Sequence, residues 1–327
     1  MPTPAVLASS PYLWTVLVAV PLVLLGLAAG RLNGRVVPLF GPARPPRPRG
    51  GAGAAPVRAE GPPGTDRDDT DSDDAEAVPG ATGDGPRRGP GTVEEEDEGP
   101  PPPRCPHCLA EIRFLPGLPA VEARAFRRRG ACPHCERVIR SDPAVIAATA
   151  VLFGLVGAVG ALGHHLSPFG LLAVLWLVSV GVPLSVIDLR VMRLPDAVVA
   201  PAYPVAAALL GASVLLPPSG PDPGRAAEAL LSMVFVTVVY WLLWRVHRGG
   251  IGFGDVKLSG LTGLYAGWAA GPLGALVAVF WAFAAFSLVG LALMALRRLT
   301  RRDPYPLGPF MLAATLATVL AGQPLLP

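Results

Sequence analysis

The stretch Y-L-W-T-V-L-V-A-V-P-L-V-L-L-G-L-A-A, residues 12–29, contains no charged side chain. As an α-helix, an uncharged apolar run of this length is long enough to cross the roughly 30 Å hydrocarbon core of a bilayer. No Lys or Arg precedes it, so it lacks the basic segment that begins a cleaved signal peptide. The first basic residues, Arg31 and Arg35, follow the run. By the positive-inside rule we expect a membrane helix whose N-terminal end faces outward and whose C-terminal end enters the cytoplasm.

The composition of the whole chain agrees with this reading. Of its 327 residues, 51% are hydrophobic and only 16% are charged, and the mean hydropathy is +0.48. Because an ordinary soluble domain carries about 25% charged residues, these values exclude that class. We therefore expect a polytopic protein of the lipid bilayer, with no nucleic-acid partner.

Seven further apolar runs follow a polar region. Together with the first run they predict an all-α polytopic membrane protein of about eight transmembrane helices. The expected further spans are 144–162, 169–187, 197–216, 226–244, 256–271, 272–296 and 307–325.

Glycines recur at helical spacing in two of these runs. Gly263, Gly267 and Gly271 are four residues apart, and Gly26 and Gly30 repeat the spacing in the first run. Glycines four apart on one face of a helix let two helix backbones approach closely in lipid. They predict tight helix packing.

The basic residues are segregated by this topology. With eight spans and the N-terminus outside, the outer loops contain one basic residue, Arg225, and the other 26 of 27 Lys and Arg lie on the inner side. If one span had been missed, these residues would be scattered over both faces. The distribution therefore favours eight spans with both termini outside.

Four regions differ in composition. Residues 1–40 hold the first helix and residues 143–327 hold the other seven. Residues 41–104 contain no Leu, Ile, Met or aromatic residue but fourteen Asp or Glu. Such a segment buries too little apolar surface to offset chain entropy, so a disordered linker is expected, with an acidic docking tail as the alternative. Residues 105–142 contain all four cysteines and predict a small cytoplasmic domain.

The cysteines form two C-P-H-C motifs, at Cys105 and Cys108 and at Cys132 and Cys135, with 23 residues between them. Two C-x-x-C pairs at this separation bring four thiolates within tetrahedral reach of one Zn²⁺. The reducing cytoplasm argues against structural disulfides. A redox dithiol is the alternative, but the duplication within so short a segment favours a structural zinc site.

His107 and His134 lie inside the two motifs. They are not expected to be ligands, because four thiols complete a tetrahedral coordination sphere.

Two carboxylates are distinguished by their predicted depth in the membrane. Asp188 ends the third span and Asp255 opens the sixth, both at the cytoplasmic side, although they are far apart in sequence. Acidic groups near a membrane are costly and usually functional. Two neighbouring carboxylates that hold one proton between them can activate water and protonate a scissile amide. Proton coupling in transport would use the same pair.

The second acid stands in I-G-F-G-D-V-K, residues 251–257. Gly252 and Gly254 are expected to allow a backbone turn and the close approach of an extended substrate. Lys257 is expected either to tune Asp255 electrostatically or to anchor the helix at the interface.

These residues resemble a known family, the bifunctional prepilin peptidases, which are membrane aspartyl proteases with a G-x-G-D signature. I-D-L-R-V-M-R-L-P-D at residues 187–196 resembles the first aspartate motif of the family, and G-F-G-D-V-K-L at 252–258 resembles the second. P-L-G-P-F at 306–310 is similar to a recurrent C-terminal element. G-R-L-N-G-R-V-V-P at 30–38 resembles the N-terminal motif, with Arg31 in place of the usual Ser. The paired C-x-x-C motifs match the cytoplasmic zinc domain of the family.

The resemblance implies that Asp188 and Asp255 are the catalytic pair and that Asp196 supports the site. It implies that type IV prepilins or pseudopilins are cut at the cytoplasmic face of the bacterial inner membrane, between a short basic leader and the apolar segment that follows it. Pilus or type II secretion assembly proteins would be partners. Many members also methylate the new N-terminus with S-adenosylmethionine, an activity associated with the zinc domain.

Two other classes of protein remain compatible with the residues alone. A proton-coupled transporter also uses paired acids, although usually near the membrane midplane and with internal repeats. A zinc-ribbon membrane scaffold of a secretion or pilus machine would carry the same cysteines with inert aspartates.

Overall fold

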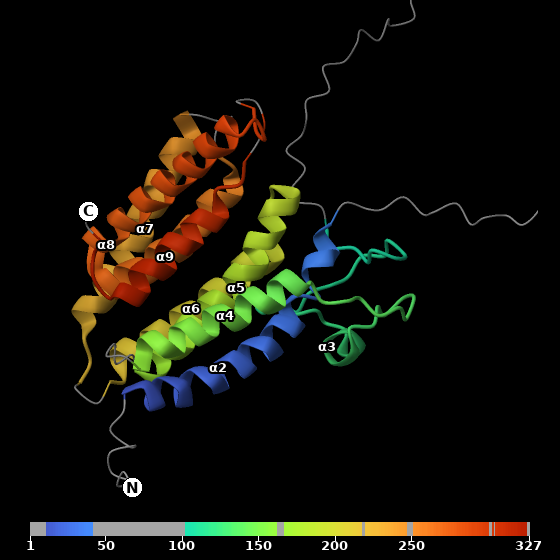
Figure 1. The fold of residues 1–327 in the computed structure, drawn as a ribbon, viewed down its shortest axis with the longest axis horizontal. Helices are drawn as coiled ribbons and strands as arrows, with labels where there is room; N and C mark the ends of the chain where they lie inside the picture. The colour runs from blue at the N-terminus through green and yellow to red at the C-terminus, as the bar shows by residue number, and fades with distance from the viewer. Residues whose placement is uncertain are drawn as a thin grey trace, which may run out of the picture. The chain divides into compact units, whose positions relative to one another are not determined.

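The computed structural model of the chain describes residues 11–41, 102–161, 167–217, 220–246, 251–300, 303 and 305–325. Most of the linker expected at 41–104 lies outside these ranges. The described part is helical, and its elements can be followed in Figure 1. They are α2 (Pro11–Asn33), the 3-10 helix η1 (Val37–Phe40), α3 (Arg124–Arg129), α4 (Pro143–Ala161), α5 (Pro168–Val191), α6 (Asp196–Leu215), α7 (Pro223–Val246), α8 (Phe253–Ala295) and α9 (Gly308–Ala321).

Six of the described helices are long and apolar enough to cross a membrane. They are α2, α4, α5, α6, α7 and α8, while α9 has 14 residues and is a shorter apolar helix. The predicted all-α polytopic fold is therefore confirmed. The two spans expected at 256–271 and 272–296 are both contained in α8, which has 43 residues.

The helix α8 is broken near its middle. Ala270 and Gly271 have non-helical backbone angles, and Gly271 has a φ of +67°, which favours glycine. Pro272 follows directly and cannot donate a backbone hydrogen bond. A straight helix of this length would extend for about 65 Å, twice the thickness of the hydrocarbon core. The break divides α8 into two segments of transmembrane length, at the boundary that the sequence predicts.

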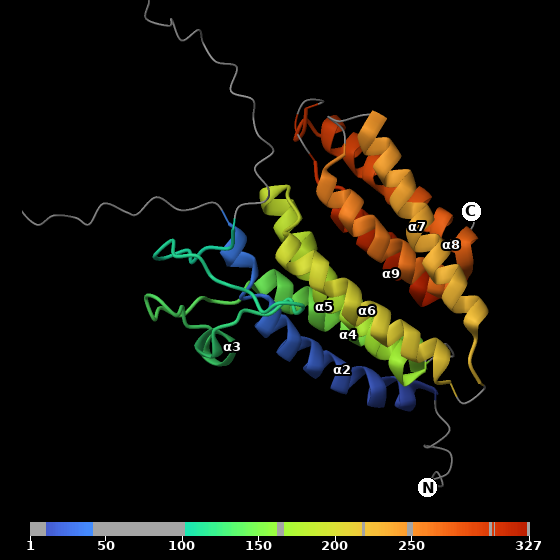
Figure 2. The ribbon, with the colours of Figure 1, turned by 180° about the vertical axis from the view of Figure 1, so that it is seen from behind.

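The spaced glycines lie where helices touch, as predicted. In Figures 1 and 2, α2 lies alongside α4, and α7 lies alongside α8. A Cβ atom added at Gly26 or Gly30 would lie 2.8 Å from a backbone Cα atom of α4. A Cβ atom added at Gly263 would lie 2.8 Å from the carbonyl oxygen of Ser232 in α7. Larger residues at these positions would therefore force the helices apart.

Two helices, α4 and α5, begin with a side-chain cap followed by proline. Ser167 caps α5, because its hydroxyl accepts the N–H of Gly170 at 3.1 Å and Pro168 begins the helix. Asp142 precedes Pro143 at the start of α4, and its carboxylate accepts the N–H of Ala144 at 2.9 Å. These two turns set where the chain enters each helix.

The cysteine-containing segment packs on the chain that follows α2. Its buried core includes Ile112, Phe126 and Ile139. Leu39 and Phe40 of η1 join this core, and the Phe40 ring lies 6.0 Å from the ring of Phe114. Residues 36–40 thus belong structurally with the cysteine segment as much as with the first helix.

We predict that Gly263→Ala destabilises the protein by about 1–3 kcal/mol, because the new methyl group overpacks the contact of α8 with α7. Thermal unfolding in detergent would report this as a lower Tm. The matched control is Gly290→Ala in the same helix, where an added Cβ atom meets no atom within 4 Å. Equal Tm values for the two variants would contradict the close packing.

Candidate active site

Asp188 lies in the last turn of α5 and is buried, with 4% of its surface exposed. The helix ends at Val191, because the next residue, Met192, adopts a left-handed conformation, and the N–H of Met192 donates to the carbonyl oxygen of Asp188 at 2.8 Å. The carboxylate Oδ2 accepts the backbone N–H of Gly308, the first residue of α9, at 3.1 Å. Asp188 therefore joins the end of α5 to the start of α9.

Gly308 has to be a glycine for this contact to form. A Cβ atom added there would lie 2.7 Å from Oδ2 of Asp188 and 3.4 Å from its Cγ. Such a Cβ would displace the carboxylate from the N–H group that it accepts. The P-L-G-P-F element at 306–310 therefore supplies the backbone donor that holds Asp188, a role that its sequence does not indicate.

Asp255 lies in the first turn of α8 and is also buried, with 9% of its surface exposed. Its Oδ2 accepts the backbone N–H of Gly252, the N-cap residue, at 3.3 Å. The carboxylate thus satisfies one of the free N–H groups at the start of its own helix.

The end of α5 and the start of α8, which contain the two acids, lie near each other. A Cβ atom added at Gly308 would lie 2.7 Å from Oδ2 of Asp188 and 3.6 Å from Cδ2 of Leu258, which is three residues after Asp255 in α8. Among the described residues, neither carboxylate forms an ion pair. Two buried acids without a cation suit a site in which one group carries a proton and the other is ionised.

The two glycines before Asp255 differ in how much room each leaves for a side chain. Gly252 has a φ of −72°, which any residue adopts, so the turn that would require glycine at this position is not found. The constraint lies at Gly254, where an added Cβ atom would stand 3.0 Å from Cβ of the buried Leu194. Leu194 belongs to the first aspartate motif, so the absence of a side chain at Gly254 lets the two motifs pack directly.

Lys257 and Asp196 connect the same two motifs at the surface. The Lys257 Nζ donates to both carboxylate oxygens of Asp196 at 2.7 Å. The ammonium also lies 5.0 Å from the centre of the Phe253 ring. Tyr203 of α6 donates to the carbonyl oxygen of Lys257. The ion pair of Lys257 is with Asp196, and it ties the start of α6 to the start of α8.

A further buried acid, Asp142, was missed by the sequence reasoning. It pairs with Arg190, two residues after Asp188, and its backbone N–H donates to the carbonyl oxygen of Gly34 at 3.0 Å. The Asp-Pro dipeptide at a helix start was the available signal, since Asp is a preferred N-cap and Pro a preferred first helical residue.

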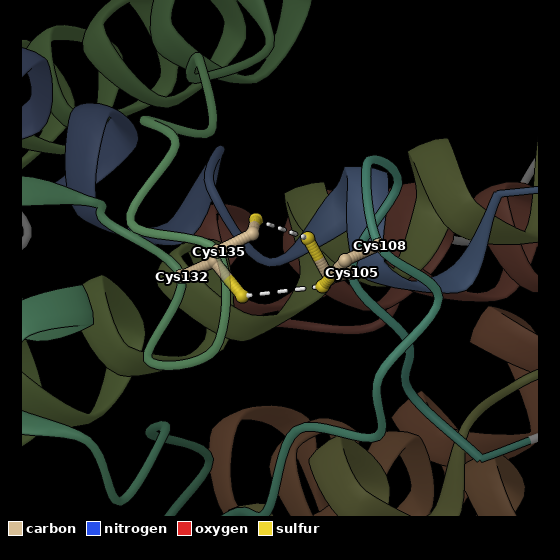
Figure 3. A group of neighbouring side chains, drawn as sticks. All are labelled: Cys105, Cys108, Cys132 and Cys135. Carbon is tan, nitrogen blue, oxygen red and sulfur yellow. Dashed lines mark hydrogen bonds between the residues drawn. The ribbon is translucent and has the colours of Figure 1, made fainter.

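The four cysteines lie together, as Figure 3 shows. Cys105 and Cys135 have their sulfur atoms 3.9 Å apart, and those of Cys108 and Cys132 are 3.8 Å apart. All four sulfur atoms lie within 4.8 Å of one another. A tetrahedral site with metal–sulfur bonds of about 2.3 Å needs sulfur atoms about 3.8 Å apart, whereas a disulfide needs about 2.05 Å. The arrangement fits a metal site.

The backbone around the cysteines supports this arrangement. The N–H groups of His107 and His134 donate to the sulfur atoms of Cys105 and Cys132, each at 3.4 Å. Both histidine side chains are exposed, and the four-residue ligand group contains cysteines only. Burial raises the pKa of the Cys105 thiol to about 12, so a metal ion that binds there releases its proton.

Comparison with known proteins relates this chain to one family. Residues 171–294, which include Asp188 and Asp255, match the model of the "Type IV leader peptidase family". Two curated relatives from Burkholderia pseudomallei, strains 1026b and K96243, are each 32% identical over 225 residues. The match covers 67% of this chain and 67% of each relative, and both relatives are named "Prepilin leader peptidase/N-methyltransferase".

The chain belongs to the type IV leader peptidase family. No solved structure matches it significantly. Membership in this family and the apolar helices identify a multi-pass protein of the inner membrane. The part matched by the leader peptidase model runs from α5 into the second half of α8, whereas the cysteine segment lies outside it.

We predict one metal ion per chain in the purified protein, measured by elemental analysis, because the four sulfur atoms already have tetrahedral spacing. The double substitution Cys105→Ser and Cys132→Ser should abolish binding. As the matched control, His107→Ala with His134→Ala should retain a full complement of metal. Loss of the metal in this control would show that an imidazole is a ligand.

Proposed function

We propose that this protein is a membrane aspartyl endopeptidase that removes the basic leader from type IV prepilins or pseudopilins, with Asp188 and Asp255 as its catalytic pair. The observation that carries the proposal is that two carboxylates are buried, one in the last turn of α5 and one in the first turn of α8, within the segment that matches the leader peptidase family. Family membership supports prepilins as the substrates.

The chemistry uses one proton on the pair. The ionised carboxylate takes a proton from a water molecule as the water oxygen attacks the scissile carbonyl carbon, and the protonated carboxyl donates its proton to the carbonyl oxygen. The resulting gem-diol intermediate collapses with cleavage of the C–N bond. The proton taken from water passes to the leaving amine, and a hydroxyl proton of the intermediate returns to the other carboxylate as the new carbonyl group forms. The pair ends the cycle with one proton, as it began.

The depth of the site suits the substrate. A prepilin has a short basic leader followed by an apolar helix, so its scissile bond lies where the hydrocarbon begins. Asp188 in the last turn of α5 and Asp255 in the first turn of α8 are at helix ends. The segregation of Lys and Arg supports a cytoplasmic location for the acids and the cysteine segment, with both termini outside.

The residues around the pair hold the backbone in place. Gly254 packs on Leu194, and Lys257 pairs with Asp196, so the two aspartate motifs are joined at two points. We infer that Asp196, Gly252, Gly254 and Lys257 support the site without reacting.

The acids' position also weighs against a transporter. Paired acids in a proton-coupled transporter more often lie near the membrane midplane, at broken helices. Here the one broken membrane helix in the described ranges, α8, breaks at residues 270–271, four turns from Asp255.

We propose that the metal of the four-cysteine site is structural Zn²⁺. Four thiolates fill a tetrahedral sphere and leave no position for water, so the ion stabilises residues 105–142 and takes no part in cleavage. Its role is to fold a segment that has a small apolar core, completed by residues 36–40.

N-methylation of the new terminus is a second proposed activity, supported by the name of the two relatives. It would use S-adenosylmethionine as the methyl donor. Mass spectrometry of the processed pilin decides this point, because a methylated N-terminus supports both activities and an unmethylated one leaves cleavage alone.

We predict that Asp188→Asn and Asp255→Asn each lower cleavage of a type IV prepilin by about 10²- to 10⁴-fold, because each removes an acid–base group. The assay reconstitutes enzyme and prepilin in vesicles and follows leader release. Asp303→Asn, at an exposed acid, is the control and should leave cleavage unchanged. If Asp188→Asn or Asp255→Asn cleaved the prepilin at the wild-type rate, that residue would not belong to the catalytic pair.

Gly308→Ala should lower kcat by about tenfold to a hundredfold, because the added methyl group displaces the carboxylate of Asp188. The kinetic assay is the same, and Gly290→Ala serves as the control for adding a methyl group to a membrane helix. An unchanged kcat in Gly308→Ala would show that Asp188 does not need its present position.

A further inference from the structure

An apolar groove of about 450 Å³ lies among α4, α5 and α9. The helix α5 packs against both α4 and α9, so the groove follows α5 with the other two helices at its sides. Leu152 and Leu155 come from α4, and Leu312 and Leu316 come from α9. Ser185 is the one residue with a polar side chain among the described residues that line it.

One end of the groove reaches the proposed catalytic pair. Ser185 lies three residues before Asp188 on α5, and Pro309 directly follows Gly308, whose N–H binds the Asp188 carboxylate. The other end is formed by Leu177 of α5 and Leu320 of α9. The groove therefore starts beside Asp188 and leads away from it along the membrane-spanning helices.

The dimensions of the groove suit a helical segment. From Pro309 to Leu320 it follows α9 for about 16 Å, which is three helical turns and about half of the hydrocarbon thickness. Two exposed small residues of α9, Ala313 and Ala317, line it. Small residues let a second helix backbone approach closely in lipid, where packing drives association.

We propose that this groove binds the apolar helix that follows the scissile bond of the prepilin. The inference rests on the proposed function and adds to it the binding site for the product side of the substrate. Its basis is continuity: cleavage places the scissile bond at Asp188 and Asp255, the substrate becomes apolar directly after that bond, and the groove opens at Asp188 with an apolar lining. Binding along three helical turns positions the bond at the acids.

The test is a groove-filling substitution with a matched control. Ala317 is an exposed alanine on α9 that lines the groove, and Ala208 is an exposed alanine on α6 that does not. Ala317→Trp should raise the KM for a type IV prepilin in vesicles by about tenfold, equivalent to about 1.4 kcal/mol of lost binding, with kcat nearly unchanged. Ala208→Trp should leave KM unchanged. Equal KM values for wild type and both variants would overturn the groove while cleavage itself stands.

A second measurement does not depend on how the tryptophan variant folds. A photo-crosslinking residue at Leu316 should form adducts with the first turns of the prepilin apolar helix, mapped by mass spectrometry, in enzyme that carries Asp255→Asn to prevent turnover. The same residue at the exposed Leu231 of α7 should not. Adducts with lipid alone at Leu316, at saturating prepilin, would overturn the proposal.

The two proposals can fail separately. If wild-type enzyme does not cleave the prepilin, the proposed function fails, and the Leu316 adducts still decide whether the groove binds the apolar helix. If cleavage occurs but neither the KM shift nor the adducts are found, the groove proposal alone is overturned.

Discussion

The site depends on one constraint: a carboxylate buried in a membrane protein needs a hydrogen-bond partner, and Asp188 has a backbone N–H. An unsatisfied polar group in this environment costs several kcal/mol. The donor comes from Gly308, 120 positions later in the chain, and only a residue without a side chain can bring it so close. This single contact fixes the start of α9 against the end of α5. It thereby sets the position of one acid of the pair and the end of the apolar groove.

The same end of the helices is reinforced from the cysteine segment. Asp142 is the last residue of that segment. It caps α4, its N–H donates to the carbonyl oxygen of Gly34 after α2, and its carboxylate pairs with Arg190 near Asp188. On the other side, Lys257 and Asp196 join α8 to α6. The four-cysteine site and the aspartates are thus mechanically connected through α4 and α5, although the family match covers only the latter helix. A structural metal that orders residues 105–142 would also order the start of α4.

Much of this could be predicted from the sequence because membrane proteins obey strong local rules. Helix spans follow from hydropathy, and the expected boundary between spans 256–271 and 272–296 coincides with the break in α8 at Ala270 and Gly271. Glycines four apart predicted close helix packing, and the structure shows that the partners are α4 for α2 and α7 for α8. The C-x-x-C spacing predicted the sulfur cluster. Of the two glycines before Asp255, Gly252 has a φ that any residue adopts, and Gly254 is the one whose position leaves little room for a side chain. Two glycines beside an acid do not reveal which of them faces a neighbouring side chain.

The sequence by itself determined the helices, the cysteine cluster and the place of one acid at the end of α5 and another at the start of α8, since each depends on residues that are close together in the chain. Only the tertiary structure decided which partners hold them: Gly308 for Asp188, Leu194 for Gly254, Asp196 for Lys257 and Arg190 for Asp142. It also decided that α5 and α9 border an apolar groove that ends beside Asp188. The physical reason is that hydrogen bonds and close packing between remote segments depend on how the helices are arranged, and no local spacing encodes that arrangement.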